Sequence, residues 1–399
     1  MRQIPPAAVA ALRRRVSGVV AYPADVGYGE YVEQDERPVV VVVAATDDDL
    51  VATAQIARDH GLPLHVRATG HGADAVPTGG LLLLTHRLRD VVVDADAETA
   101  SVSAGARWQD VADAADAHGL AVVSTHARWG GVVGSVLRGG LGPQARRHGL
   151  CSEHVVSVRV VGVDGFVHDR IDVEAPDSAA VVVRLTLRLH ADVAVTGGRV
   201  TVSRPHALRD WVRRHREMPD GVTALAVAHD GVADEVTSRV ERAGGSDQSA
   251  ARWLAQHGDP GLRRPRWQRG WLVADLPEDA VEVLAAFPGR VEVRRLGGRL
   301  RHSAGLAGAE WSVRTTVDDV GADGLDVIDL DDWPMRLDDV LVPLAPTGQL
   351  THLGLLDTVD RRPDEERRDR SDRDRTHERR RTDALHDTDP TDQTQETVA

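Results

Sequence analysis

Apolar runs and helical patterns alternate along the first part of the chain. The run at 39–45 consists of valine and alanine alone, which is typical of a strand buried on both faces. Thr46 and Asp49 form the pattern of a capping box, which predicts a helix that begins there and ends near Gly61. A second short strand at 64–67 completes a βαβ unit, so this region is predicted to hold a parallel sheet.

Short strands dominate the chain from residue 80 to residue 190. The turn Asp164-Gly165 between two valine-rich segments favours a hairpin over 155–167. The segment 181–190 alternates Val or Leu with Arg or Thr, which is the pattern of a half-exposed strand. A helix is predicted at 107–118, and the other strands are predicted at 80–85, 90–94 and 99–104.

A second α+β unit begins after about residue 195. Helices are predicted at 205–217, 233–243 and 277–287, and strands at 222–228, 270–276 and 290–295. From about residue 358 the chain is a mixed-charge run that cannot offset its ordering entropy, so it is predicted to be disordered. The predicted units are an N-terminal helix and loop (1–37), a first domain (38–192), a second domain (193–345) and a charged tail (358–399).

The composition excludes several classes of site. The 399 residues include 48 basic and 62 acidic side chains, and the net charge of −14 argues against general affinity for nucleic acid or anionic lipid. Every basic residue is an arginine, so neither a lysine Schiff base nor a lysine-bearing phosphate loop can form. Cys151 is the single cysteine, which excludes an intrachain disulfide and a cysteine-rich zinc site.

The apolar segments are short everywhere in the chain. The first residues lack the apolar run of a secretory signal peptide. No stretch approaches the roughly 20 apolar residues of a membrane-spanning helix. We therefore expect a cytoplasmic protein whose partner is a small-molecule substrate, with neither nucleic acid nor a membrane as a partner.

Glycine-rich loops follow the predicted strands of the first domain. The segment Arg67-Ala68-Thr69-Gly70-His71-Gly72 comes directly after the second strand of the βαβ unit. Small residues in such a loop let backbone N–H groups approach a pyrophosphate closely. Further glycines follow at 130–134, at 138–142 and in His148-Gly149-Leu150.

By these segments, residues 18–190 resemble the PCMH-type FAD-binding domain of the vanillyl-alcohol oxidase superfamily, in particular its berberine-bridge-enzyme-like branch. Arg37-Pro38-Val39-Val40 is similar to the family's first strand, and 67–72 is similar to its Arg-x-Gly-Gly-His-Ser loop. Gly105-Ala106-Arg107-Trp108 is similar to its Gly-Ala-x-Trp helix start. The resemblance implies an α+β fold, with an FAD-binding domain of two α/β subdomains and an α+β substrate domain with an antiparallel sheet.

The resemblance also implies that FAD is held by the glycine-rich loops. A histidine in the family's first loop is often bonded covalently to the 8α methyl group of the flavin, and that position falls on His71. The alternative is a histidine that only packs or forms a hydrogen bond. A second covalent link through cysteine is not supported, because Ala127 stands at its position beside His126. The implied cofactor-binding residues are Arg67, Ala68, Thr69, Gly70, His71, Gly72, Gly131, Gly134, Gly139, Gly140, Gly142 and Val182.

The chain departs from the family pattern in places that concern catalysis. The glycine-rich segment that contacts the flavin ring in the family is missing after Asp169. No tyrosine follows Tyr31, which excludes the tyrosine base that the family's C-terminal segment often supplies. His302 is then a candidate base, because an unperturbed imidazole titrates near neutral pH. The alternative is an ordinary surface histidine.

The leading hypothesis is an FAD-dependent oxidoreductase. It takes a hydride from a small organic substrate and passes the electrons to O₂ or another acceptor. The alternative is a degenerate flavin-fold protein without catalysis, which acts as a binding or scaffold protein. A nicotinamide-binding Rossmann enzyme is disfavoured, because Ala44-Ala45-Thr46-Asp47 follows the first strand where a Gly-x-Gly-x-x-Gly motif would be needed.

Overall fold

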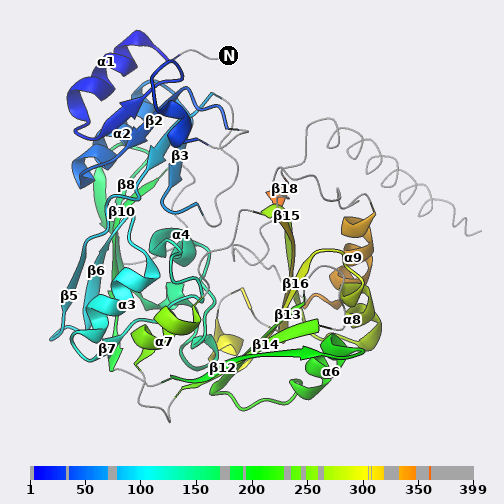
Figure 1. Cartoon of the computed structure of the whole chain (residues 1–399). Helices are drawn as coiled ribbons and strands as arrows, with labels where there is room; N and C mark the ends of the chain where they lie inside the picture. The colour runs from blue at the N-terminus through cyan, green and yellow to red at the C-terminus, as the bar shows by residue number, and fades with distance from the viewer. Residues whose placement is uncertain are drawn as a thin grey trace, which may run out of the picture.

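The computed structural model consists of an N-terminal part with short strands and a C-terminal part built on one large sheet (Figure 1). The described residues are 4–32, 36–70, 79–170, 180–191, 195–228, 235–243, 249–258, 265–303, 305–306, 308–318, 332–346 and 359–360. His71, Gly72 and, apart from Val359 and Asp360, the tail predicted to be disordered lie outside these ranges.

The first subdomain is a four-stranded sheet in the order β1-β2-β4-β3. Strands β2 and β3 each pair in parallel with β4, so the βαβ prediction is confirmed, with β4 inserted between the two strands. All side chains of β2 and β4 are buried, as continuous apolar runs predict. The elements are α1 (Pro6–Arg15), β1 (Val19–Ala21), β2 (Val40–Val43), α2 (Asp47–Asp59), β3 (Leu64–Arg67) and β4 (Leu81–Leu84).

The carboxylate of Asp49 fixes the start of α2 to the loops around it. The predicted capping box is present, since Thr46 Oγ1 accepts a bond from the N–H of Asp49 and the Asp49 carboxylate accepts one from the N–H of Thr46. The same carboxylate also accepts bonds from the N–H groups of Ser17, Gly18 and Ala45. Burial alone would raise the pKa of Asp49, but these bonds hold it below its usual value.

The second subdomain is a five-stranded antiparallel sheet in the order β5-β6-β10-β8-β9. The predicted hairpin is confirmed as β8 and β9. Strand β10 is central, and the predicted alternation of exposure holds only from Arg184 onward, because residues 181–183 are all buried. The elements are β5 (Val91–Asp94), β6 (Thr99–Ser103), α3 (Trp108–Asp116), β7 (Leu120–Ala121), α4 (Val132–Leu137), α5 (Ala145–His148), β8 (Val155–Val161), β9 (Val167–Arg170), β10 (Val181–Arg188) and β11 (His190–Ala191).

Helix α7 (Ala250–His257) packs on the second subdomain although it lies far along the chain (Figure 1). The sequence patterns above do not predict it. Trp253 and Leu254 are buried in the same apolar core as Trp108 of α3. The core of the N-terminal part is therefore completed by a segment from the C-terminal half.

The large sheet is antiparallel, with the strand order β12-β14-β13-β16-β17-β15-β18. Helices α6, α8 and α9 lie on the same side of it (Figure 1). The strands are β12 (Val195–Ser203), β13 (Val222–Ala228), β14 (Glu235–Ala243), β15 (Pro265–Val273), β16 (Arg290–Arg295), β17 (Trp311–Asp318) and β18 (Val359–Asp360). The helices are α6 (Ala207–Arg214), α8 (Glu278–Ala285) and α9 (Trp333–Leu341).

The prediction of a helix at 233–243 is wrong, because β14 occupies most of that segment. Val236, Val240 and Ala243 recur at the spacing of a helix face, which explains the error. The segment pairs along its length with β12 and β13, and this tertiary pairing outweighs the local pattern. Strand β15 also ends at Val273, so the strand predicted at 270–276 is right only in its first half.

The two faces of the large sheet differ in chemistry. Residues such as Ala226, Val293 and Val313 point to the helices and share an apolar core with Leu208 and Leu284. On each strand, the residues that alternate with these point to the opposite face of the sheet. This face is turned toward the N-terminal part (Figure 1).

The helices of the described ranges are short. The longest, α2, has 13 residues, and none of them has the length and apolar character that a membrane span requires. Short 3₁₀ turns complete the fold at η1 (Tyr28–Glu30), η2 (Cys151–His154), η3 (Gly298–His302) and η4 (Val342–Leu344).

Candidate functional site

The first glycine-rich loop is anchored by a buried ion pair at its start. Arg67 Nη1 lies 2.8 Å from a carboxylate oxygen of Glu36, and the two side chains are exposed by 9% and 2%. Arg67 also donates a hydrogen bond to the carbonyl oxygen of Tyr31. The side chain of Arg67 therefore secures the loop to the preceding segment, and the loop then turns at Gly70, where φ is +78°.

The structure brings the first and second glycine loops together. Thr69 Oγ1 accepts a hydrogen bond of 3.1 Å from the backbone N–H of Gly131. A Cβ atom on Gly131 would lie 3.2 Å from the Cβ of Ala68, so the two loops approach as closely as glycine allows. Thr69 thus uses its hydroxyl to join the loops.

The other predicted glycines have different surroundings. Gly134 in α4 faces open space, because a Cβ atom there would meet no atom within 4 Å. Gly140 has φ +70° and lies against Cys151, which a Cβ atom would approach to 2.6 Å. A Cβ atom on Gly142 would collide with the carbonyl oxygen of Ser124. Gly134 therefore leaves room beside the loop, whereas Gly140 and Gly142 make room for neighbouring parts of the chain.

Two predicted positions lie in the protein interior. Val182 of β10 is exposed by 5% and belongs to the apolar core that also contains Trp108. Gly139 has φ +87°, and its carbonyl oxygen accepts a hydrogen bond from the N–H of Ser152. Cys151 is buried, and burial raises the pKa of its thiol, so it is not a reactive cysteine.

A histidine and a glutamate connect the N-terminal part to the large sheet. His126 Nε2 lies 3.2 Å from the carboxylate of Glu241 on β14, and the two side chains are exposed by 6% and 2%. The indole of Trp253 lies edge-on to the His126 ring. His126 stands beside Ala127 in the loop that leads to Gly131, so this pair places the sheet next to the glycine loops.

Further contacts across this interface involve arginine. Arg294 Nη1 donates a 3.0 Å hydrogen bond to the carbonyl oxygen of Leu141, next to the glycine turn. Arg146 Nη1 donates to the carbonyl oxygen of Val222 at 2.7 Å. An apolar cluster containing Leu141 and Leu296 packs beside these bonds. The sheet face is therefore held directly against the glycine-rich segments.

The face of the large sheet that meets the glycine loops is rich in charge; we call it the polar face. Strand register places Glu292 directly opposite Arg314, and Arg294 opposite Ser312. Arg290 Nη2 donates to a carboxylate oxygen of Glu292 at 2.6 Å. The polar face is defined by Arg239 and Glu241 of β14, Arg290, Glu292 and Arg294 of β16, and Arg314 of β17.

The ionisable groups of the polar face influence one another. Burial alone would raise the pKa of Glu292, but Arg290, Arg314 and Arg294 lower it to about 2. Burial lowers the pKa of Arg294 to about 10, and the positive charge of Arg314 contributes in the same direction. At neutral pH the Glu292 carboxylate and the Arg294 guanidinium are therefore both charged.

The sequence analysis missed most of this face. Arg239, Glu241 and Glu292 are not singled out by any local pattern discussed above. The detectable signal is the alternation of charged and apolar residues at 290–295, which places three charges on one side of a strand. Glu241 gave no such signal, because its segment was predicted to be helical.

His302 lies at the end of η3 and is exposed. Within the described ranges, no three His, Cys, Asp or Glu side chains are arranged to hold a metal ion.

Residues 38–169 match the family model described as "FAD binding domain". This segment is an FAD-binding domain. Among curated proteins, this chain is 32% identical over 129 residues to the FAD-linked oxidoreductase hasG of Aspergillus fumigatus. The aligned residues cover 32% of this chain and 28% of hasG. It is 27% identical over 169 residues to (R)-6-hydroxynicotine oxidase of Paenarthrobacter nicotinovorans, covering 41% of this chain and 37% of the oxidase. The chain thus matches well under half the length of either relative.

The similarity in fold to known proteins extends beyond the residues that match the family model. A solved structure of berberine bridge enzyme, in a variant described as a reticuline dehydrogenase, superposes with a TM-score of 0.75 at 15% identity. The superposition covers 88% of this chain and 87% of that one. Nearly the whole chain therefore shares the fold of that structure, although most residues differ.

The residues present fit FAD at the meeting point of the two glycine loops. Thr125 Oγ1 and His126 Nδ1 are buried side-chain atoms without a hydrogen-bond partner. A Cβ atom on Gly134, which follows Gly131 in the same segment, would face open space. Gly131 itself has no side chain, so another molecule can approach its backbone closely. A polar cofactor bound here would supply partners to atoms that the protein alone leaves unsatisfied.

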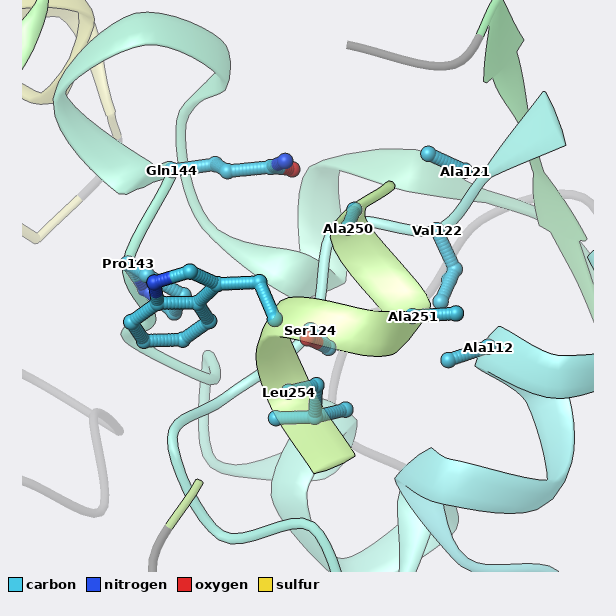
Figure 2. A pocket seen from close by; sticks show the side chains of 10 residues that line it. Ala112, Ala121, Val122, Ser124, Pro143, Gln144, Ala250, Ala251 and Leu254 are labelled. Carbon is cyan, nitrogen blue, oxygen red and sulfur yellow. The ribbon is translucent and has the colours of Figure 1, made fainter. Parts of the chain in front are cut away.

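A crevice elsewhere in the FAD-binding domain is not a flavin site. It lies where α7 meets the segments around Ser124 and Gln144 (Figure 2). Ala251 and Leu254 line one side, and Ala112 lines another (Figure 2). The space inside holds about one water molecule, so it is a packing gap between the helix and the domain.

Proposed function

We propose that the protein is an FAD-dependent oxidoreductase acting on a small organic molecule. The observation that carries this proposal is the buried polar face held against the glycine loops by the His126–Glu241 pair and by Arg294. A scaffold needs no buried charge at such an interface, because apolar residues would pack there at lower cost. A substrate-binding surface beside a flavin does need polar groups that fix orientation.

The glycine loops supply the cofactor site in this proposal. FAD, when bound, accepts a hydride from the substrate and passes the electrons to O₂ or another acceptor. The backbone around Thr69, Gly70 and Gly131 holds the pyrophosphate, while Thr125 and His126 donate or accept hydrogen bonds. The polar face orients the substrate and, together with the packed leucines beside Leu141, excludes bulk water.

His71 is the proposed covalent anchor of the flavin. It follows Gly70 directly in the sequence, and Thr69 of the same segment accepts a hydrogen bond from the N–H of Gly131. A neutral imidazole nitrogen there would supply the nucleophile for a bond to the 8α carbon of the flavin; that methyl group would lose a proton, the flavin ring would take up the electron pair, and O₂ would reoxidise it. The purified protein tests this by its visible spectrum before and after acid precipitation.

Three outcomes of that measurement separate the hypotheses. Flavin bands that remain in the pellet support covalent FAD, and His71→Ala should then release all of the flavin while the control His302→Ala does not. Bands released into the supernatant support a non-covalent site. A colourless protein that takes up no added FAD overturns the proposal and favours the degenerate, non-catalytic alternative.

Catalysis itself is tested by anaerobic reduction. A panel of small alcohols, amines and hydroxy acids is mixed with the yellow protein, and bleaching of the flavin band near 450 nm, a property of flavins in general, is followed. Bleaching by one class and recovery of colour on admitting O₂ support an oxidase. Protein that retains FAD and is bleached by no compound, although dithionite reduces it, counts against the oxidoreductase proposal.

A further inference from the structure

One edge of the large sheet differs from the other sheet edges in its length. Strand β12 lies at this edge, and within the described part of the chain it pairs with β14 alone, along nine residues (Figure 1). Every other described strand at a sheet edge has at most four residues. An edge strand presents a row of unpaired backbone N–H and C=O groups, and a short strand limits that row.

Strand β12 also lacks the other features that protect a sheet edge. Its sequence contains no proline and a single charged residue, Arg199, and its pairing with β14 runs without a bulge. None of the residues 196–203 is buried. Val200 is exposed by 62%, although its side chain is apolar. Proteins normally protect a long edge strand with charge, proline, a bulge or a covering segment, so we expect this strand to have a partner.

We propose that β12 pairs with β12 of a second copy of this chain, so that two large sheets join into one across a two-fold axis. Antiparallel pairing of a strand with itself is compatible with two-fold symmetry, because residue i of one copy meets residue j of the other while j meets i. The pairing supplies hydrogen-bond partners to the outward N–H and C=O groups of both edges. It also closes the assembly at two chains.

The side chains of β12 select the register of this pairing. With Arg199 on the axis the whole strand would pair, but two guanidinium groups would lie directly opposite each other, which is destabilising. With Val200 on the axis, residues 197–203 pair, Val200 meets its own counterpart, and Arg199 meets a threonine. An axis at Gly198 pairs as many residues but places Val200 opposite Thr196, so it buries less apolar surface. We therefore expect the axis at Val200.

The surroundings of Val200 favour a second copy as the occupant of this edge. Strand register places Val200 beside Ser238 of β14, and Ser238 Oγ accepts a 2.8 Å hydrogen bond from the indole of Trp211 in α6. Val200 therefore lies on the side of the sheet that the helices cover, at the border of that layer. Pairing of two copies brings their valines together there, and it extends the apolar layer from one sheet into the next.

The mass of the protein in solution is the first test. Sedimentation equilibrium of the full chain at micromolar concentration should give twice the mass of one chain. Val200→Lys places two ammonium groups opposite each other and should raise the dissociation constant of the dimer about tenfold. Val92→Lys is the matched control, because Val92 is also exposed by 62% on an edge strand, β5, which has only four residues.

Val200→Cys tests the position of the contact without adding a charge. Directly opposite residues of an antiparallel pair have Cα atoms about 4.5–5.5 Å apart, which a disulfide can bridge. Mild oxidation should therefore link two chains of Val200→Cys, and a non-reducing gel should show the doubled mass. Val92→Cys should cross-link far more slowly. Cys151 is buried and does not compete with the new thiol.

Each outcome decides the proposal. A doubled mass that Val200→Lys lowers and Val92→Lys does not, with selective cross-linking of Val200→Cys, supports it. A wild-type protein with the mass of one chain overturns it, and so does a dimer that the two lysine variants weaken equally. A dimer in which Val200→Cys cross-links no faster than Val92→Cys uses another surface, which also overturns it. None of these measurements involves FAD, so failure here leaves the proposed oxidoreductase function untouched.

Discussion

His126 Nε2 lies 3.2 Å from each carboxylate oxygen of Glu241, across the junction between the FAD-binding domain and the large sheet. Both side chains are almost fully buried. The two residues are 115 positions apart in the chain, so their contact forms only when both domains are folded. The pair therefore couples the stability of the sheet to that of the cofactor domain.

Removing this pair should loosen the junction. Glu241→Ala leaves the His126 ring without its partner and is expected to lower the free energy of unfolding by about 3 kcal/mol. Glu241→Gln should cost less, because an amide can still pair with an imidazole nitrogen. Urea unfolding is the measurement, and Glu235→Ala, an exposed position of the same strand, is the control. Equal midpoints for Glu241→Ala and Glu235→Ala would contradict the coupling.

The ion pair between Arg67 and Glu36 should support the cofactor loop. Arg67→Met removes one partner of a pair that is buried on both sides, and it is expected to cost about 3 kcal/mol in stability. The loop that begins at Arg67 should also hold FAD less tightly, which fluorescence titration of the flavin measures. Arg58→Met is the control, because Arg58 pairs with Asp59 at the surface. Unchanged FAD affinity in Arg67→Met would show that the loop is held without the pair.

Because of His148, His154 and His190, we expect the FAD-binding domain to lose stability in acid. His190 Nε2 lies 2.9 Å from His154 Nδ1, so one nitrogen must accept the proton of the other. Burial and the neighbouring His190 lower the pKa of both His148 and His154 to about 4. The folded protein thus favours their neutral forms, while the unfolded chain binds protons near pH 6.5.

Stability contributed by these groups is complete above about pH 6.5 and is lost as the pH falls toward 4. The melting temperature of the wild-type protein should therefore decline over this window. His190→Gln removes one titrating ring and should flatten the decline, whereas His118→Gln, at an exposed position, should leave it unchanged. Parallel curves for all three proteins would refute the assignment.

The sequence predicts those parts of the fold that are specified locally. The valine run of β2, the capping box at Thr46 and the hairpin turn at Asp164-Gly165 each carry their signal within a few residues. Helix α7 was missed because Trp253 is stabilised by packing against α3, about 140 residues earlier. The polar face was missed because it exists only when β14, β16 and β17 are in register.

The candidate site also combines features that the sequence specifies locally with contacts that form only in the folded structure. The sequence identifies Thr69 and Gly131 as loop residues, but their hydrogen bond is a tertiary contact. A glycine in a sequence also does not reveal what occupies the space beside it. For Gly140 that neighbour is Cys151, whereas Gly134 has open space.

Gly140→Ala should therefore act on the fold. Its Cβ atom would lie 2.6 Å from that of Cys151, and the backbone φ of +70° disfavours a side chain. We expect a loss of about 2 kcal/mol in unfolding free energy. Thermal unfolding of the apoprotein measures it, and a melting temperature equal to that of the wild type would be inconsistent with this close contact.

Gly134→Ala should instead weaken the binding of FAD without destabilising the fold. Alanine favours a helix over glycine by about 1 kcal/mol, and its Cβ atom meets no protein atom within 4 Å, so the apoprotein should be as stable as the wild type or slightly more so. If FAD occupies the open side of α4, the added methyl group should weaken FAD binding several-fold. The comparison needs the melting temperature of the apoprotein and the FAD dissociation constant of both glycine variants. Unchanged FAD affinity in Gly134→Ala would mean that FAD does not bind beside α4.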